Sequence, residues 1–396
     1  MAKESFGMID RLPSGNYRAR YTGPDKQRHT ALSTFRTKGA ARVWLAERQT
    51  QIAGGLWQPP HLEALERAKK AAEASRGNQS LGAYAEQWLA TRTNSHGEPL
   101  RARTVEEYER LLRVPDTHKK NDKGGPLAPL VQEKIALISP EDIRRWRAAT
   151  IKTGKLTQTS RAYDLLKSIL KTALEDKIIT ENPCQIKGGS STSSGKAVVP
   201  PTDSELEIIL DTIDVRYKAL VAIAAAGGLR WGEVTAIRFK DMLIERDTAG
   251  APLVRLRVER ATVRTNVGFV VGAPKSRAGF RTVAIFGIDA QIIADYVTSS
   301  DKKSADLLFS AVKNKSSPLS QSTFNRHWTN ARKAANRQDM PFHALRHYAG
   351  TRYSQSGATI KETMVRLGHS SEKAAMRYQH AGTRDDELAA RVARYI

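Results

Sequence analysis

The sequence predicts a chain of several domains that is mainly α-helical and contains small β-sheets. Its 396 residues are enough for two or three domains. Apolar residues recur at the three- and four-residue spacing of helices over most of the chain, whereas short alternating runs gather near its start and after residue 250. Hydrophobic residues make up 40% of the chain, which is sufficient to build real cores.

The first part, residues 1–65, is predicted to be a small strand-rich domain. Turn-forming residues separate three short runs with partial alternation, at 5–12, 17–22 and 28–34. A helical pattern over 38–52 follows and is closed by two glycines. We therefore expect a three-stranded sheet with one helix.

Residues 79–186 are predicted to form a helical domain. One face of its first helix collects Leu81, Tyr84, Ala85, Trp88 and Leu89. Thr104 with Glu107 resembles a capping box at the start of a second helix. Ser139, followed by proline and two acidic residues, indicates another helix start, and a further long helix is predicted over 159–178.

A linker and a mixed domain follow. Residues 187–198, rich in Gly and Ser, have the composition of a flexible linker. Residues 199–396 are predicted to form a helical domain with a small sheet insertion. The expected elements are a helix at 205–226, strands at 253–263, 269–271 and 281–285, and helices from 288 onward.

The charge of the chain indicates an anionic partner. There are 64 Lys and Arg against 41 Asp and Glu, a formal net charge of +23, and such a surplus repels itself in the folded state unless it is neutralised. The candidates are DNA, RNA and acidic membrane. No apolar run is long enough to span a membrane, and the start lacks the apolar core of a secretion signal. The single cysteine, Cys184, excludes an internal disulfide and a Cys-based zinc site. A cytoplasmic nucleic-acid protein is the simplest interpretation.

Two basic regions are candidates for DNA contact. Residues 1–60 hold ten Lys and Arg and four Asp and Glu, and a small sheet with this charge could place a strand face in a DNA groove. The alternative is a small basic domain without sequence preference. In the helical domain the alternative is a merely solvated face. The candidate residues are Arg18, Arg20, Arg28, Arg144, Arg147, Arg161 and Lys167.

Two clusters in the last domain could act on a phosphodiester through their cations. Arg230 is predicted at a turn after a helix, and its guanidinium fork suits two phosphate oxygens. Glu233 could fix another basic group, although Arg-x-x-Glu is also a common helix-surface pair. Lys275 is predicted on a hairpin connection between strands. There it could give up its proton if nearby positive charge lowers its pKa, and a solvated loop lysine is the alternative.

A third cluster joins a histidine to an arginine. His343 and Arg346, three residues apart, share one helical face. His343 and His347 also stand at metal-ligand spacing, but the carboxylate of a His-Glu-x-x-His motif is missing, so we do not favour a metal site.

The fourth cluster contains a tyrosine. Gly368 is predicted to end one helix, and Ser370 or Ser371 to cap the next. Tyr378, nine residues beyond His369, then falls about two turns into the new helix. A buried, hydrogen-bonded tyrosine is the alternative.

In order and spacing these clusters resemble the tyrosine recombinase (phage integrase) family. The resemblance covers residues 205–378 strongly and the helical domain more weakly. The basic start is similar to the arm-binding domains of phage integrases. The residues that carry the resemblance are Arg230, Lys275, His343, Arg346, Gly368, His369 and Tyr378.

The resemblance implies a reaction in which Tyr378 attacks the scissile phosphate and leaves a 3′-phosphotyrosyl link and a 5′-hydroxyl. Arg230 and Arg346 would hold the non-bridging oxygens, and Lys275 would protonate the departing 5′ oxygen. No metal or cofactor would be required, because the protein–DNA link conserves the bond energy.

The remaining residues would support this chemistry. His343 would assist proton transfer at the tyrosine, His369 would hydrogen-bond the phosphate, and Glu233 would be a supporting residue. The expected assembly is a homo-tetramer on double-stranded DNA with core and arm sites, near the nucleoid of a bacterial host. A host DNA-bending protein and an excision factor are possible partners. The tail, residues 387–396, is expected to pack against a neighbouring protomer.

Several alternatives remain. A type IB topoisomerase shares the chemistry, a chromosome-dimer resolvase shares the reaction, and a DNA-binding regulator could carry a disused site. Tyr348, Tyr353 and Tyr395 are rival nucleophiles, but none lies nine residues beyond a Gly-His pair. Residues 189–196 imitate a phosphate-binding loop, but the spacing of their glycines does not fit one.

Overall fold

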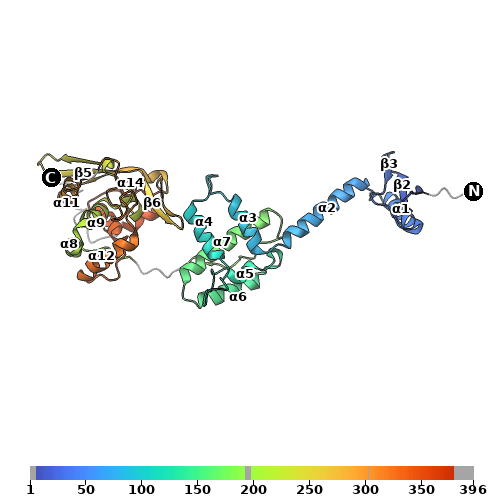
Figure 1. The fold of residues 1–396 in the computed structure, drawn as a ribbon, viewed down its shortest axis with the longest axis horizontal. Coiled ribbons are helices and arrows are strands. Elements are labelled where there is room, and N and C mark those ends of the chain that lie inside the picture. Colours follow the sequence, from blue (N-terminus) through green and yellow to red (C-terminus); the bar gives the residue numbers. More distant parts are fainter. Residues whose placement is uncertain (1–5, 192–197, 302, 379–396) are drawn as a thin grey trace, which may run out of the picture. The chain divides into compact units, whose positions relative to one another are not determined.

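The computed structural model describes residues 6–191, 198–301 and 303–378 (Figure 1). The chain divides into one unit of residues 1–100 with 107–194 and another of 101–106 with 195–396. The fold class is confirmed, because helices dominate and the sheets are small. Residues 192–197, half of the predicted linker, lie outside the described residues, and the predicted tail lies wholly outside them. The exact domain boundaries stay predictions.

The N-terminal segment has the predicted three strands and helix. Strands β1 (Met8–Arg11), β2 (Tyr17–Thr22) and β3 (Arg28–Thr30) form an antiparallel sheet in the order β1-β2-β3. Helix α1 (Lys38–Ala53) begins at Thr37, whose side chain accepts a hydrogen bond from the N–H of Ala40. The helix packs on one sheet face, so the alternate β2 residues Ala19 and Tyr21 are buried.

Helix α2 (Pro60–Gly77) was not predicted. Its sequence is rich in Ala, Glu and Lys, which favour helix formation without producing an apolar stripe. An ion pair between Arg48 and Glu63 joins its first turn to α1 at 2.5 Å. The domain end predicted at residue 65 falls inside this helix.

The helical segment is built around one long helix. Its elements are α3 (Leu81–Thr91), α4 (Ala102–Leu112), α5 (Ala128–Val131), α6 (Pro140–Ile151) and α7 (Leu156–Glu175). The predicted apolar face of α3 is buried or partly buried against α7. Two polar links fix this pair, Tyr84 Oη to Asp176 at 2.7 Å and Trp88 Nε1 to Thr172 at 3.0 Å.

One predicted helix start is confirmed and one is wrong. Ser139 caps α6 and forms a capping box with Asp142. The box predicted for Thr104 and Glu107 does not form, because α4 already begins at Ala102 and the carbonyl of Arg101 accepts from the N–H of Thr104.

The last segment surrounds a small sheet with helices. Its helices are α8 (Asp203–Thr212), α9 (Val215–Gly227), α10 (Trp231–Val234), α11 (Gly287–Thr298), α12 (Gln321–Ala334), α13 (Ala344–Gln355), α14 (Ile360–Leu367) and α15 (Glu372–Ala375). Its strands are β4 (Met242–Arg246), β5 (Pro252–Val258), β6 (Ala261–Thr265), β7 (Gly268–Gly272) and β8 (Arg281–Ile285). The sheet order is β4-β5-β8, all antiparallel, and β6 and β7 form a separate hairpin.

Three details of this segment differ from the prediction. The helix predicted over 205–226 is broken between α8 and α9, where Asp214 caps the second helix. The strand predicted over 253–263 is two strands belonging to different sheets. Strand β4 was not predicted.

Helix α9 lies at the centre of this segment. Its residues are buried on nearly every side, and it packs against α11 and α13. Because the helix is enclosed by the core, its C-terminal end is fixed, and this fixes the position of the residues that follow it. The candidate site begins at the C-terminal end of α9.

We expect Ile223→Ala in α9 to lower the free energy of unfolding of this segment by about 2–5 kcal/mol, because Ile223 is fully buried and its loss leaves a cavity. Hydrogen exchange of peptides from 203–378, measured across a urea series, monitors this segment separately from the others. The control is Val215→Ala in the same helix, which should change stability by less than about 0.5 kcal/mol, since Val215 is 77% exposed. Equal losses in the two variants would contradict the assignment of α9 to the core.

Candidate active site

Arg230 stands at the junction between α9 and α10. Helix α9 ends at Gly228, whose φ of 66° is left-handed and favours glycine. Arg230 then occupies the N-cap position of α10. Its N–H donates to Oε2 of Glu233 at 2.9 Å and its Nη1 donates to Oε1 at 2.7 Å. The carboxylate therefore holds the guanidinium while the Arg230 side chain remains 40% exposed.

Glu233 is a buried carboxylate shared by two arginines. Its side chain is 3% exposed, and Oε2 also accepts from Nη2 of Arg281 at 2.9 Å. Burial alone would raise the pKa of Glu233, but the charge and hydrogen bond of Arg281, together with Arg230, hold it below its ordinary value. The carboxylate therefore stays ionised at neutral pH.

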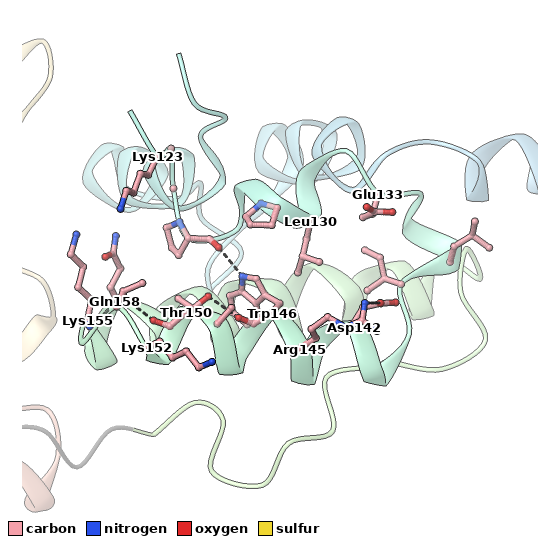
Figure 2. Close-up of a pocket in the computed structure, with 18 residues that line it drawn as sticks. Lys123, Leu130, Glu133, Asp142, Arg145, Trp146, Thr150, Lys152, Lys155 and Gln158 are labelled. Carbon is pink, nitrogen blue, oxygen red and sulfur yellow. Dashed lines mark hydrogen bonds and ion pairs between the residues drawn. The ribbon is translucent and has the colours of Figure 1, made fainter. Parts of the chain in front are cut away.

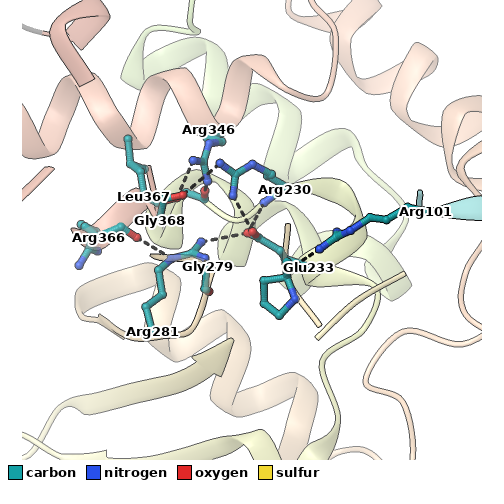
Figure 3. A network of polar contacts seen from close by, with 11 residues as sticks. Arg101, Arg230, Glu233, Gly279, Arg281, Arg346, Arg366, Leu367 and Gly368 are labelled. Atoms are coloured by element: carbon teal, nitrogen blue, oxygen red, sulfur yellow. Dashed lines mark hydrogen bonds and ion pairs between the residues drawn. The ribbon is translucent and has the colours of Figure 1, made fainter. Parts of the chain in front are cut away.

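Arg346 is held by the ends of two helices (Figure 3). Its Nη1 donates to the carbonyl of Gly228 at 2.7 Å and its Nη2 to the carbonyl of Leu367 at 2.5 Å. These carbonyls lie at the C-termini of α9 and α14, where the helix dipole favours a cation. Burial, followed by the charge of Arg230, lowers the pKa of Arg346 to about 9.

Gly368 and His369 join the arginines to the tyrosine. Helix α14 ends at Gly368 with φ 66°, as predicted, and the Gly368 carbonyl accepts from Nη2 of Arg230 at 3.3 Å. Nδ1 of His369 is buried and has no hydrogen-bond partner among the described residues. The His369 ring lies parallel to the ring of Tyr378, with centroids 5.8 Å apart.

Tyr378 is 4% exposed and closes the described chain. It follows α15 in a single 3₁₀ turn. Ser371 occupies the predicted N-cap position of α15, but its side chain makes no capping hydrogen bond. Its ring also lies 5.4 Å from that of His347, centroid to centroid. A Cβ on Gly350 would come within 2.8 Å of Cδ1 of Tyr378, so glycine is needed there to admit the ring. The phenol is thus buried beside the cationic cluster rather than away from it.

The histidines around Tyr378 have lowered pKa values in this setting. Burial, with the charges of His347 and Arg346, lowers the pKa of His343 to about 4. Burial, with Arg346 and Arg230, does the same for His369, and the pKa of His347 is also lowered. His343 stacks edge-on against His347 at 5.0 Å between centroids. At neutral pH these imidazoles are uncharged, so each keeps a nitrogen that can accept a hydrogen bond.

Lys275 is not brought into the cluster. It is exposed, in the connection from β7 to β8, and its ammonium forms no hydrogen bond or ion pair within the described part of the chain. The prediction that this connection is a hairpin is wrong, because β7 pairs with β6 and β8 pairs with β5. The connection therefore passes from one sheet to the other.

Sequence reasoning missed two members of the cluster, Arg281 and His347. Arg281 is buried and donates to the carbonyls of Arg366 and Gly279 as well as to Glu233. One signal was available. Arg281, Val283 and Ile285 are the inward residues of β8, and a charged residue at an inward position needs a buried partner.

Two rival tyrosines have other partners. Tyr348 donates its hydroxyl to Oδ1 of Asp203 at 2.7 Å, and burial together with that hydrogen bond raises its pKa. The ring of Tyr353 lies under the guanidinium of Arg366, 4.7 Å from its centroid. The third, Tyr395, lies outside the described residues.

The candidate DNA-contacting residues are mostly accessible. Arg18 and Arg20 lie on the face of β2 opposite α1 and pair with Asp10, and Arg28 reaches the sulfur of Met8 on the same face. In the helical segment Arg161 contacts Glu107 at 3.5 Å. Of the others, Arg144 and Lys167 are exposed and Arg147 is half-buried.

A hollow of about 970 Å³ lies between α5 and α6 (Figure 2). Its floor holds Leu130 and Trp146, whose Nε1 donates to the carbonyl of Pro126 at 2.7 Å, and several lysines stand at its rim. None of the predicted site residues lines it. In the part of the chain that the structure covers, no group of three His, Cys, Asp or Glu side chains could hold a metal, and no helix there is long and apolar enough to cross a membrane.

The lowered histidine pKa values predict a pH dependence of stability. The unfolded chain binds these protons near the ordinary pKa of 6.5 and the folded chain near 4, so stability present above about pH 6.5 is lost as the pH falls toward 4. The urea midpoint of the segment 203–378, followed by hydrogen exchange of its peptides, should fall as the pH is lowered over this range. In the double variant His343→Gln/His369→Gln the urea midpoint should depend less steeply on pH. NMR should find both imidazoles of the wild type neutral at pH 6. Imidazoles half-protonated near 6.5 would contradict the arrangement.

Comparison with known proteins places this chain among integrases. The model described as Phage integrase family matches residues 202–384, and that of the Phage integrase N-terminal domain matches 5–54. The putative prophage phiRv2 integrase of Mycobacterium tuberculosis is 36% identical over 98% of this chain and 95% of its own length. The integrase of Mycobacterium phage D29 is 31% identical over 98% of this chain and 97% of its own.

Solved structures show the same fold at low identity. The Tn1549 transposon integrase in complex with circular intermediate DNA is 20% identical, with a TM-score of 0.58 over 78% of this chain and 98% of that one. A lambda integrase dimer bound to a COC′ core site is 17% identical, with a TM-score of 0.52 over 95% of each chain.

Proposed function

Because this chain belongs to the phage integrase family of site-specific tyrosine recombinases, we propose that Tyr378 is its nucleophile and that the cluster around Tyr378 is its active site. One observation carries the proposal. Segments near residues 230, 346, 369 and 378, far apart in sequence, meet through direct hydrogen bonds and ring contacts.

The proposed reaction is an exchange of phosphodiester bonds. The Tyr378 oxygen attacks phosphorus, the bond to the 5′ oxygen breaks, and a 3′-phosphotyrosyl link forms. In the second step a 5′-hydroxyl attacks that link and releases the tyrosine, so one phosphodiester is regenerated. No bond energy is lost between the steps, which removes any need for a nucleotide cofactor.

Arg230 and Arg346 are proposed to bind the two non-bridging oxygens. Charge developing on these oxygens is stabilised most by donors that are already in place. Arg346 meets this requirement through its two carbonyl contacts, and Arg230 through Glu233. The exposed fraction of Arg230 leaves it accessible to a phosphate arriving from solvent.

The proton transfers are assigned to the remaining residues. His343, uncharged at neutral pH, is proposed to assist removal of the phenol proton. The buried Nδ1 of His369 has no partner among the described residues, so its ring has hydrogen-bonding capacity left for a phosphate. Lys275 is exposed, and its ammonium has no partner among the residues that the structure describes. It is proposed to reach the departing 5′ oxygen when DNA is bound.

The substrate is double-stranded DNA, and we propose that four protomers act on two attachment sites. A lambda integrase tetramer bound to a Holliday junction supports such an assembly. Residues 1–65 are proposed to bind arm sites and residues 79–186 to bind core sites. Residues 187–198 are proposed to link the core-binding domain to the catalytic domain, residues 199–396. A host DNA-bending protein, an excision factor and a nucleoid location belong to the same proposal.

Tyr378→Phe should abolish covalent adduct formation on a suicide duplex, in which a nick lets the cleaved strand diffuse away. Phenylalanine keeps the ring packing but removes the nucleophilic oxygen. The adduct is read by denaturing electrophoresis, and peptide mapping locates the linked residue. Tyr348→Phe and Tyr353→Phe are the matched controls and should still form adducts. An adduct in Tyr378→Phe would show that another tyrosine is the nucleophile.

Arg28→Ala should weaken binding to a duplex from the element's ends and reduce the salt dependence of that binding. Each lost phosphate contact lowers the slope of log K against log salt by about 0.9. The control is Arg42→Ala, which removes an exposed arginine from α1, the helix that covers the opposite face of the sheet. Filter binding over a salt series measures both slopes. An unchanged slope for Arg28→Ala would exclude this strand face from DNA binding.

A further inference from the structure

We propose that Arg281 is a positioning residue, which holds the Glu233 carboxylate and through it the phosphate-binding guanidinium of Arg230. This inference rests on the proposed function, in which Arg230 binds the scissile phosphate. Arg281 does not touch the reacting atoms in this scheme. It acts through its neighbours.

The guanidinium of Arg281 joins three separate segments (Figure 3). Its Nη2 donates to Oε2 of Glu233 at 2.9 Å, its Nε to the carbonyl of Arg366 at 2.8 Å, and its Nη1 to the carbonyl of Gly279 at 3.1 Å. The side chain is 3% exposed. Every nitrogen of the fork is therefore used, and each contact is shielded from water.

These contacts determine how the Glu233 carboxylate is oriented. Oε2 accepts from Arg281 and from the N–H of Arg230, which leaves Oε1 directed at Nη1 of Arg230. Without Arg281, the carboxylate would be buried with only Arg230 as its cationic partner and could rotate toward it. The direction of the Arg230 fork would then no longer be set.

Arg281 also supports the second anchor of Arg230. A Cβ on Gly368 would lie 3.0 Å from Nη1 of Arg281, so the guanidinium packs closely against this turn. The Gly368 carbonyl accepts from Nη2 of Arg230, and His369 follows directly. Arg281 thus contacts both groups that hold Arg230, the Glu233 carboxylate and the Gly368 turn.

A role limited to folding would not require this geometry. Lysine at 281 would keep the positive charge next to Glu233, but its three N–H donors share one nitrogen and cannot replace a planar fork whose three separate nitrogens reach three acceptors. The positioning role therefore predicts that Arg281→Lys folds and binds DNA but cleaves slowly. Small displacements of a binding group can cost about 100-fold in rate.

The test uses the full chain and the suicide duplex at saturating DNA, with adduct formation followed in a single turnover. Arg281→Lys is expected to form adduct about 100-fold more slowly than wild type, while its affinity for the uncleaved duplex and its melting midpoint stay close to wild type. The matched control is Arg255→Lys. Arg255 lies on the neighbouring strand β5 and pairs with Glu245 at 2.8 Å, but it is largely exposed.

A double-mutant cycle with Glu233→Gln separates action through Glu233 from independent action. If Arg281 works through Glu233, the double variant cleaves no more slowly than the slower single variant. The inference would be overturned if the rate losses of the two single variants multiplied in the double variant. It would also be overturned if Arg281→Lys cleaved at the rate of Arg255→Lys. If wild type itself forms no adduct at Tyr378, the proposed function fails instead. Should Arg281→Lys melt early, the adduct rates of all variants are compared at a temperature below its melting midpoint, where cleavage by folded Arg281→Lys at the rate of Arg255→Lys would still overturn the inference.

Discussion

The candidate site depends on one buried carboxylate, Glu233, placed between two arginines. Guanidinium groups repel one another, and burial adds the cost of desolvation, which appears in the lowered pKa of Arg346. Glu233 offsets this by accepting from Arg230 and Arg281 at once. The cationic cluster can then exist before DNA arrives, and groups already in place would spare the proposed reaction the cost of assembling them.

Helix ends provide the rest of the anchoring. Helices α9 and α14 both finish at a left-handed glycine, and each directs carbonyls at the cluster. Those carbonyls bind Arg346 and Arg230 without adding further negative charge. Because α9 is enclosed by the core, the packing that stabilises the segment also sets the positions of the arginines proposed to bind phosphate. Fold and site are therefore coupled through the same helix.

The charges of the chain act in two ways, through the net charge of the whole molecule and through the groups close to Tyr378. The 64 Lys and Arg exceed the 41 Asp and Glu, and the resulting formal net charge of +23 favours DNA at long range. Near Tyr378, burial first and the charge of neighbouring arginines second lower the pKa of His343 and His369, so uncharged imidazoles lie beside buried arginines. Neutral bases and permanent cations are thereby kept distinct at one site, which a reaction combining proton transfer with charge stabilisation requires.

The sequence by itself determined the local features. Helical periodicity indicated α3 and α7, alternation indicated β1 to β3, and Gly368 marked a helix end, because each depends on neighbours a few residues apart. It also singled out Arg230, Glu233, His343, Arg346, His369 and Tyr378 as candidate site residues by their order and spacing, and their roles stay proposals. Only the tertiary structure decided that Arg281 and His347 join this group and that Lys275 stands apart from it. The contacts responsible span 48 residues between Arg281 and Glu233 and 138 between Arg230 and Gly368. Separations of that length are set by how helices and strands pack, and no local pattern records them.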